Sequence, residues 1–357
     1  MFSLRFINGV YSLVDMRKIM ESIQQWLLHS SIHGNHGEVY SWVNPVHQGY
    51  LYNEIVGYFI TYLVALYDQE HDENKKEEYL KEALKSVSCL QKQMLRGALG
   101  RGEIVYAFDT GICLTGLLHL QKKVTDQEKE YVDACIQRLL PFFLEQLKNK
   151  NAAINNNTQQ QVFDKEKWSL SYGCLLMKMA IPLYLLFEKT QESKYKEQAI
   201  ALCQELIFCC FHKDHFSINE YVPWVYTHPH CYATEGLLFL QEKGIHEFDQ
   251  IILKAAQWLA QQQNADGSLY SWYYRPGAEK VKNGDCNAQA IRIWLAVDST
   301  KYKKNIKNGF SFIQTLQSSE GGLYYNPTSQ DINSWVSLFT WQAYNWKLHG
   351  VNCEYIM

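Results

Sequence analysis

The chain has 357 residues, of which 47% are hydrophobic, 20% charged and 14% aromatic, including 24 Tyr and 10 Trp. Its formal net charge is −3 and its pI about 6.5, so it lacks the basic surface that would indicate nucleic acid as a partner. No apolar run approaches the roughly 20 residues of a membrane span. The composition is therefore typical of a globular protein with a full hydrophobic core.

The first residues, Met1 to Tyr11, contain one arginine and no sustained apolar run, which predicts that there is no secretory signal. Ten cysteines are scattered along apolar stretches, and none forms a Cys-x-x-C pair. Free thiols without a signal favour a reducing, cytoplasmic location.

A helical stretch, a loop rich in glycine and aromatic residues, and a short apolar helix follow one another six times along the chain. The first helix of each unit carries Lys, Glu and Gln on one face, as an outer helix should. We expect outer helices over residues 16–29, 77–95, 126–148, 193–211, 246–263 and 302–317. The second helix is apolar nearly all round, which is typical of a helix buried on both sides. We expect these inner helices to begin near residues 53, 109, 173, 236, 290 and 336.

Alternating outer and inner helices predict an all-α fold: an (α/α)6 barrel, or toroid, of about twelve helices in six hairpins. Residues 1–357 are expected to form it as a single domain. A polar stretch predicts a flexible insertion near 149–163. All six outer-to-inner loops must open at the same end of such a ring, so we expect one crowded mouth.

Two segments resemble the repeat of the α/α toroid superfamily, AAQWLAQQQNADGSLYSW at 255–272 and SFIQTLQSSEGGLYY at 311–325. Each has an outer helix, a Gln-rich turn, and glycine followed by an aromatic residue. The superfamily includes terpenoid-cyclase-like folds and (α/α)6-barrel carbohydrate-active enzymes. The Asp-x-Asp-Asp motif of class II cyclases and the Cys-His-Gly motif of lanthionine cyclases are absent. Asp285 and Cys286 are adjacent, unlike the Asp-x-Cys zinc pair of prenyltransferases. The resemblance therefore implies the carbohydrate branch, by analogy of fold.

Acidic residues recur where inner helices are expected to start: Glu54, Asp109, Glu235 and Asp285. Two such groups on opposite sides of a sugar bond would serve as general acid and general base. The alternative is that they cap helices, because acids in a first turn complement the helix dipole.

His228 and His230 flank a proline just before the fourth inner helix. Imidazole titrates near neutral pH, so we expect one of them to transfer protons together with Asp109 or Glu54. A structural turn fixed by the proline is the alternative. A metal site recruiting the next cysteine would pack three ligands into four residues, which rarely closes a tetrahedron. We therefore predict neither a metal nor a cofactor.

Aromatic, amide and arginine side chains in the loops are the candidates for binding substrate. Sugars present apolar C–H faces that pack on aromatic rings, and arginine suits a carboxylate. The candidates are Trp42, Tyr52, Arg101, Tyr106, Trp168, Trp224, Tyr270, Trp272, Tyr273, Arg275, Asn287, Gln289, Tyr324, Tyr325, Asn333 and Trp335. The expected partner is a small sugar or oligosaccharide, neutral or acidic.

The sequence thus predicts a carbohydrate-active enzyme of the glycoside hydrolase, lyase or epimerase type. It supplies both carboxylates and histidines, so it does not decide between hydrolysis and proton abstraction. Two alternatives remain open. One is a glycan-binding or scaffold protein without catalysis. The other is a terpenoid- or prenyl-processing enzyme, which would need an apolar cavity and a diphosphate site.

Overall fold

The computed structural model describes residues 12–47 and 49–357, so the expectation of no signal in residues 1–11 lies outside the described residues. Within them, outer and inner helices alternate along the chain. The outer helices are α1 (Leu13–His29), α3 (Glu73–Gln93), α5 (Asp126–Lys148), α7 (Ser193–Cys210), α9 (Asp249–Gln262) and α11 (Lys303–Gln314). The inner helices are α2 (Asn53–Gln69), α4 (Ala107–Gln121), α6 (Ala180–Thr190), α8 (Thr227–Glu242), α10 (Gly284–Asp298) and α12 (Ser334–His349).

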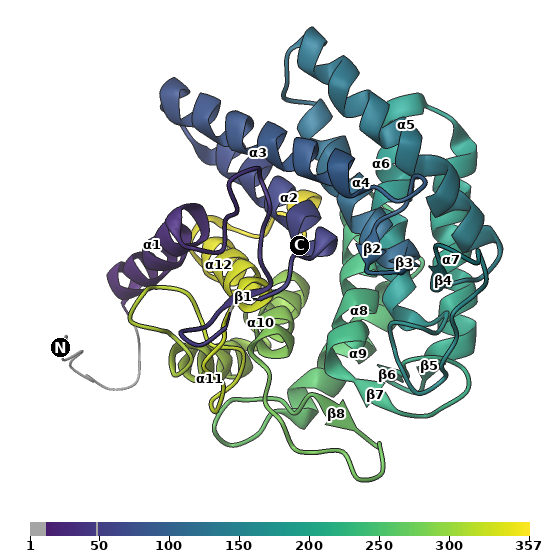
Figure 1. The fold of residues 1–357 in the computed structure, drawn as a ribbon. Helices are drawn as coiled ribbons and strands as arrows, with labels where there is room; N and C mark the ends of the chain where they lie inside the picture. Colours follow the sequence, from purple (N-terminus) through teal and green to yellow (C-terminus); the bar gives the residue numbers. More distant parts are fainter. Residues whose placement is uncertain (1–11, 48) are drawn as a thin grey trace.

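The inner helices form a closed ring. Each packs against the next, and α12 returns to α2. A 3-10 helix, η1 (Cys174–Met179), immediately precedes α6 and packs against α8. A second 3-10 helix, η2 (Cys353–Tyr355), follows α12. Figure 1 shows α1, α3, α5 and α11 at the periphery, with α10 and α12 closer to the centre. This arrangement confirms the predicted (α/α)6 barrel. No helix in the described part of the chain is long and apolar enough to cross a bilayer.

The two kinds of helix differ in what they bury. The outer helix α1 buries Met20, Ile23, Trp26 and Leu27, spaced three and four residues apart on one face. The inner helix α4 is buried along its whole length, because core packs on both of its sides. The periodicity in the sequence thus corresponds directly to the two layers of the ring.

The inner helices α2 and α4 cross unusually closely, at two glycines. A Cβ atom on Gly57 would lie 2.8 Å from the backbone nitrogen of Cys113. A Cβ atom on Gly116 would lie 2.6 Å from the carbonyl oxygen of Gly57. Any larger side chain at either position would push the helices apart. The close crossing matters for the site, because Glu54 and Asp109 stand in the first turns of these two helices.

Short antiparallel strands tie the outer-to-inner loops together. They pair β1 (Trp42–Val43) with β9 (Ile332–Asn333), β2 (Gly100–Arg101) with β3 (Ile104–Tyr106), β3 with β4 (Ala153–Asn155), β5 (Phe211–His212) with β6 (His215–Phe216), and β7 (Val225–Tyr226) with β8 (Trp272–Tyr273). The pair β1–β9 joins the first loop to the last, and β7–β8 joins the fourth to the fifth. These pairs gather the loops at one end of the barrel.

The flexible insertion expected near 149–163 stays a prediction. The segment contains the strand β4, whose Ala153 and Ile154 are buried and pair with β3. One expectation about local structure is wrong. The helices α8 and α10 begin at Thr227 and Gly284, well before the residues 236 and 290 expected from the apolar runs. Their first turns are polar because they face the mouth, and proline is tolerated in a first turn.

Candidate active site

Four titratable side chains gather where the inner helices begin. The first turns of α2, α4, α8 and α10 supply Glu54, Asp109, His228 and Asp285, and each residue is at most 5% exposed. The carboxyl of Glu54 interacts electrostatically with both Asp109 and Asp285, and the latter also interacts with His228. Four of the six predicted acid or base residues are therefore brought together at one mouth.

Glu54 is held by two hydrogen bonds that fall on the same oxygen. Its Oε1 accepts from the Tyr232 hydroxyl at 3.0 Å and from the Trp335 indole nitrogen at 3.3 Å. Burial raises the pKa of Glu54 to about 7, although both hydrogen bonds act in the opposite direction. The carboxyl is thus half protonated near neutral pH. Its proton belongs on Oε2, because Oε1 already serves as the acceptor.

Asp109 is more poorly satisfied. Its Oδ1 receives a long hydrogen bond of 3.4 Å from the Tyr52 hydroxyl, and its Oδ2 is buried without a partner among the described residues. Burial, followed by the charge of Glu54, raises the pKa of Asp109 well above its usual range. A buried oxygen without a partner is a position where a ligand group would form the missing hydrogen bond.

The Nδ1 atom of His228 has two side-chain oxygens as neighbours, one of them at hydrogen-bond distance. Its Nδ1 lies 2.6 Å from Oε1 of Gln289 and 3.8 Å from Oδ2 of Asp285. Burial lowers the pKa of His228, and the neighbouring Asp285 and Gln289 oppose that shift. The lowered pKa favours the neutral imidazole at pH 7. No hydrogen-bond partner for Nε2 occurs in the described parts of the chain.

Tyr232 lies between the acid and the imidazole. It stands one helical turn after His228 on α8, and the centroids of the two rings are 4.2 Å apart. Its hydroxyl reaches Glu54 on the opposite side of the barrel interior. His228 and Glu54 therefore both contact Tyr232, although they are 174 residues apart in sequence.

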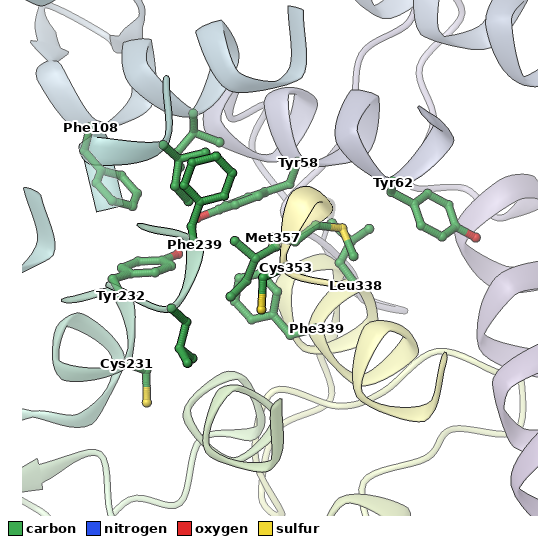
Figure 2. Packing of buried hydrophobic residues seen from close by; sticks show 14 of the residues in the cluster. Tyr58, Tyr62, Phe108, Cys231, Tyr232, Phe239, Leu338, Phe339, Cys353 and Met357 are labelled. Atoms are coloured by element: carbon green, nitrogen blue, oxygen red, sulfur yellow. The ribbon is translucent and has the colours of Figure 1, made fainter. Parts of the chain in front are cut away.

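A fully buried ionic group lies beneath the mouth. Glu235 accepts from the Lys178 ammonium at 2.7 Å and also pairs with the Arg292 guanidinium. Burial lowers the pKa of Lys178 to about 8, despite the Glu235 charge beside it. Around the ammonium lie the rings of Tyr58, Tyr232 and Phe339, which Figure 2 shows lining the interior of the barrel.

Aromatic residues form the walls of the mouth. On the α8 side, Tyr226 stacks on Trp272 with centroids 4.5 Å apart, and Trp168 contacts both Tyr226 and His228. The Arg275 guanidinium lies 4.5 Å from the Trp272 centroid and 5.2 Å from that of Trp224.

The wall on the α2 side is equally aromatic. Tyr52 packs on Trp335, and Tyr50 packs on both Tyr52 and Trp42. The Arg101 guanidinium lies 3.8 Å from the Tyr50 centroid. Several other predicted binding residues stand at the same end: Tyr106 before α4, Tyr270 before β8, and Tyr325, whose hydroxyl accepts from Asn283.

Other predicted residues lie away from the mouth. His230 points outward, where its Nδ1 accepts from the backbone of Phe216 and burial lowers its pKa to about 3. Glu235 belongs to the ionic group below, because α8 begins two turns before it. Four others bind their own loops and helices: Tyr273 packs on Trp258, Asn287 bonds the backbone of Leu269, Tyr324 pairs with Ile332, and Asn333 caps α12.

One cluster within the described residues has the composition of a metal site, namely His228, Asp285 and Cys286, whose ligand atoms lie within 4.8 Å of one another. Nδ1 of the histidine is already occupied by Gln289, and burial raises the pKa of the Cys286 thiol well above its usual range. The expectation that no metal is involved stays a prediction.

Four important residues were not predicted from the sequence: Lys178, Arg292, Tyr226 and Tyr232. The first two are charged residues inside apolar runs, CLLMKMAIPLYLLF and AIRIWLAV, where a charge requires a buried partner. Tyr232 could have been found from its spacing of four residues after His228. Tyr226 immediately precedes the helix that carries His228, so the position of the helix start would have identified it.

Comparison with known proteins supports the fold and leaves the sequence family open. No protein-family model matches the chain, and a search of curated protein sequences also finds no match. Solved structures match over nearly the whole length. A D-mannose isomerase aligns with a TM-score of 0.71 at 13% identity, covering 98% of this chain and 100% of that one.

Two further structures show the range of activities on this fold. A cellobiose 2-epimerase from Spirochaeta thermophila aligns with a TM-score of 0.66 at 13% identity, covering 94% of this chain and 98% of its own. An unsaturated glucuronyl hydrolase from Bacillus sp. GL1 aligns with a TM-score of 0.64 at 11% identity, covering 95% and 98%. At these identities the similarity establishes the (α/α)6 fold that such carbohydrate enzymes share.

Proposed function

We propose that the protein is a carbohydrate-active enzyme that isomerises or epimerises a sugar by proton transfer. The observation that carries this proposal is that a buried imidazole and a buried carboxyl of raised pKa both contact Tyr232. His228 offers an unpaired Nε2 as the base, and Glu54 offers a proton on Oε2 as the acid. The D-mannose isomerase and the cellobiose 2-epimerase named above have the same fold.

The reaction follows from these two groups. Nε2 of His228 takes the proton from the carbon beside the sugar carbonyl, and the electrons of that C–H bond form the C=C bond of an enediol. The Glu54 carboxyl protonates the carbonyl oxygen at the same time, so no charge accumulates on the sugar. For the isomer, the imidazolium returns the proton to the former carbonyl carbon, while the Glu54 carboxylate takes the proton of the hydroxyl on the neighbouring carbon, which becomes the new carbonyl. For the epimer, the enediol turns its other face to His228, the proton returns to the carbon that it left, and Glu54 takes back the proton that it gave to the carbonyl oxygen.

The pH dependence of kcat/KM tests the assignment of the two groups. Activity should fall above about pH 7, where Glu54 loses the proton that it donates. It should also fall on the acid side, at a pH below the usual imidazole value, because burial lowers the pKa of His228. The assay is the exchange of the C2 proton of D-mannose or cellobiose with D2O, followed by NMR. An alkaline limb that persists in Glu54→Gln would contradict this role of Glu54.

Hydrolysis is a second candidate, favoured by one observation. Asp109 and Glu54 are neighbouring buried carboxyls with raised pKa values, as a general acid for a glycosidic oxygen requires. The unsaturated glucuronyl hydrolase named above, which degrades glycosaminoglycan, has the same fold. Release of reducing sugar from an unsaturated glucuronyl disaccharide, without deuterium incorporation into mannose, would favour this reaction over isomerisation.

Asp109→Asn is expected to lower kcat by about 100-fold or more on whichever substrate is turned over, because the buried carboxyl binds or protonates the substrate. Glu103→Gln is the matched control, since Glu103 is an exposed acid in the turn between β2 and β3. Unchanged turnover in Asp109→Asn on every substrate, together with unchanged turnover in His228→Asn, would favour a protein that binds glycans without catalysis.

Arg275 is proposed to bind the carboxylate of acidic sugars. Its guanidinium is half-buried on two indole rings and has no acidic partner among the residues described, so its donors are free. Arg275→Ala is expected to weaken binding of a glucuronyl disaccharide by about 10-fold or more, and to leave binding of a neutral disaccharide unchanged. Isothermal titration measures both. If Arg101→Ala, and not Arg275→Ala, selectively weakened binding of the glucuronyl disaccharide, the carboxylate would be bound by Arg101 on the α2 side of the mouth.

A further inference from the structure

Gln289 connects the candidate base to the buried ionic group. Its side-chain oxygen lies 2.6 Å from Nδ1 of His228, and its side-chain nitrogen lies 3.2 Å from Oε1 of Glu235. All three side chains are buried, with Gln289 and Glu235 fully inaccessible. The chain of contacts runs from the bottom of the barrel interior to its mouth.

The neighbours of Gln289 determine which way its amide points. The carboxylate of Glu235 is held between the cations of Lys178 and Arg292, so it offers only acceptors. The amide NH2 must therefore face Glu235, and the amide oxygen must face His228. An amide oxygen is an acceptor only, so the proton of the imidazole must be on Nδ1.

Other groups around His228 point to the same tautomer. Asp285, on α10, lies 3.8 Å from the same Nδ1, beyond hydrogen-bond distance, so its charge favours a proton there without replacing the contact with Gln289. Glu235 and Lys178 also act electrostatically on the imidazole, from α8 and η1, with opposite signs. No described residue offers Nε2 an acceptor that would hold a proton.

We infer that Gln289, oriented by Glu235 and its two cations, is a positioning residue that fixes the Nδ1–H tautomer of His228 and leaves the Nε2 lone pair facing the mouth. The inference rests on the proposed function only for its catalytic consequence. The tautomer itself is a property of the resting protein and is measurable without a substrate. A glutamine that merely filled space would have no effect on the position of the proton.

The test is NMR of the full chain labelled with [15N]histidine. Long-range proton–nitrogen spectra distinguish a protonated from an unprotonated ring nitrogen, and the His228→Asn variant identifies the signals of His228. We expect Nδ1 protonated and Nε2 unprotonated in the parent protein at pH 7. We expect Gln289→Leu to lose this preference, because leucine cannot accept from Nδ1.

Gln289→Glu separates orientation from packing. A carboxylate of the same size still accepts from Nδ1 but cannot donate to Glu235, so the Nδ1–H tautomer should persist and the pKa of His228 should rise. Gln314→Leu is the control, because Gln314 is a half-buried glutamine on the outer helix α11. Its substitution should leave the His228 signals unchanged. Circular dichroism checks that each variant is folded.

The outcomes are decisive in either direction. An Nε2–H imidazole in the parent, or the same tautomer in Gln289→Leu as in the parent, would overturn the inference. If the proposed isomerisation is also correct, Gln289→Leu should lower kcat by about 100-fold with little change in KM, and Gln289→Glu should restore part of it. If no sugar is turned over, the tautomer measurement still stands, so the two failures are distinguishable.

Discussion

Glu54→Gln is expected to make the protein more stable at pH 8.5 and to leave its stability nearly unchanged at pH 4.5. Burial raises the pKa of Glu54 to about 7 from the ordinary value of 4.5. Between these values the folded state holds a proton that the unfolded state has released, so stability falls as the pH rises from 4.5 to about 7. Above pH 7 the full penalty of about 3 kcal/mol is present. Glutamine carries no charge and so avoids this penalty, and its amide oxygen can still accept the hydrogen bonds from Tyr232 and Trp335.

The measurement is thermal unfolding of both proteins across this pH range. At about 2 cal/mol/K per residue for the entropy of unfolding, 3 kcal/mol corresponds to a rise of about 4 °C at pH 8.5. Glu103→Gln should show no such difference, because the side chain of Glu103 is exposed. Equal melting temperatures of parent and Glu54→Gln at pH 8.5 would contradict the assignment. The variant should also retain only a small residual activity, as expected where function requires a destabilising group.

Glu235→Leu is expected to destabilise the protein by about 3–5 kcal/mol, because it leaves two buried cations without their anion. Both Lys178 and Arg292 are fully inaccessible, and their ion pairs converge on this one carboxylate. Urea unfolding measures the effect. Glu192→Leu is the control, because Glu192 pairs with Lys194 at the surface, where such pairs contribute at most about 1 kcal/mol.

The triple variant Lys178→Met, Glu235→Leu, Arg292→Met provides the complementary test. Replacing all three charges removes the unpaired cations, so most of the stability lost in Glu235→Leu should return. Arg292 also donates to Gln342 and to the carbonyl oxygen of Met357, so recovery should be incomplete. A triple variant less stable than Glu235→Leu would mean that these other hydrogen bonds contribute more than the ionic group.

The fold was predictable from the sequence because each layer of the ring has its own periodicity. Alternation of amphipathic and fully apolar helices specifies two rings, and the loops between them must then share one end. Glu54, Asp109, His228 and Asp285 were predictable for the same reason, since helix starts face the mouth. This argument depends only on the order of elements along the chain.

What the sequence did not reveal depends on side-chain contacts between distant helices. Glu235 and His230 stood near an expected helix start, but α8 begins earlier, so one is two turns deep and the other points outward. The contacts of Gln289 with His228 and Glu235 were not predicted. No local pattern specifies such partners, because 54 and 61 residues separate them from Gln289.

The pairing of Trp42 with Asn333 has a consequence for how the chain folds during synthesis. The first outer-to-inner loop cannot adopt its final form until the strand before α12 has emerged from the ribosome. Trp335, whose indole donates a hydrogen bond to Glu54, is synthesised equally late. Contacts of such long sequence separation slow folding, because a large loop must close before they form. Part of the apolar surface of the first helices therefore stays uncovered until then, which is the condition under which large chains aggregate.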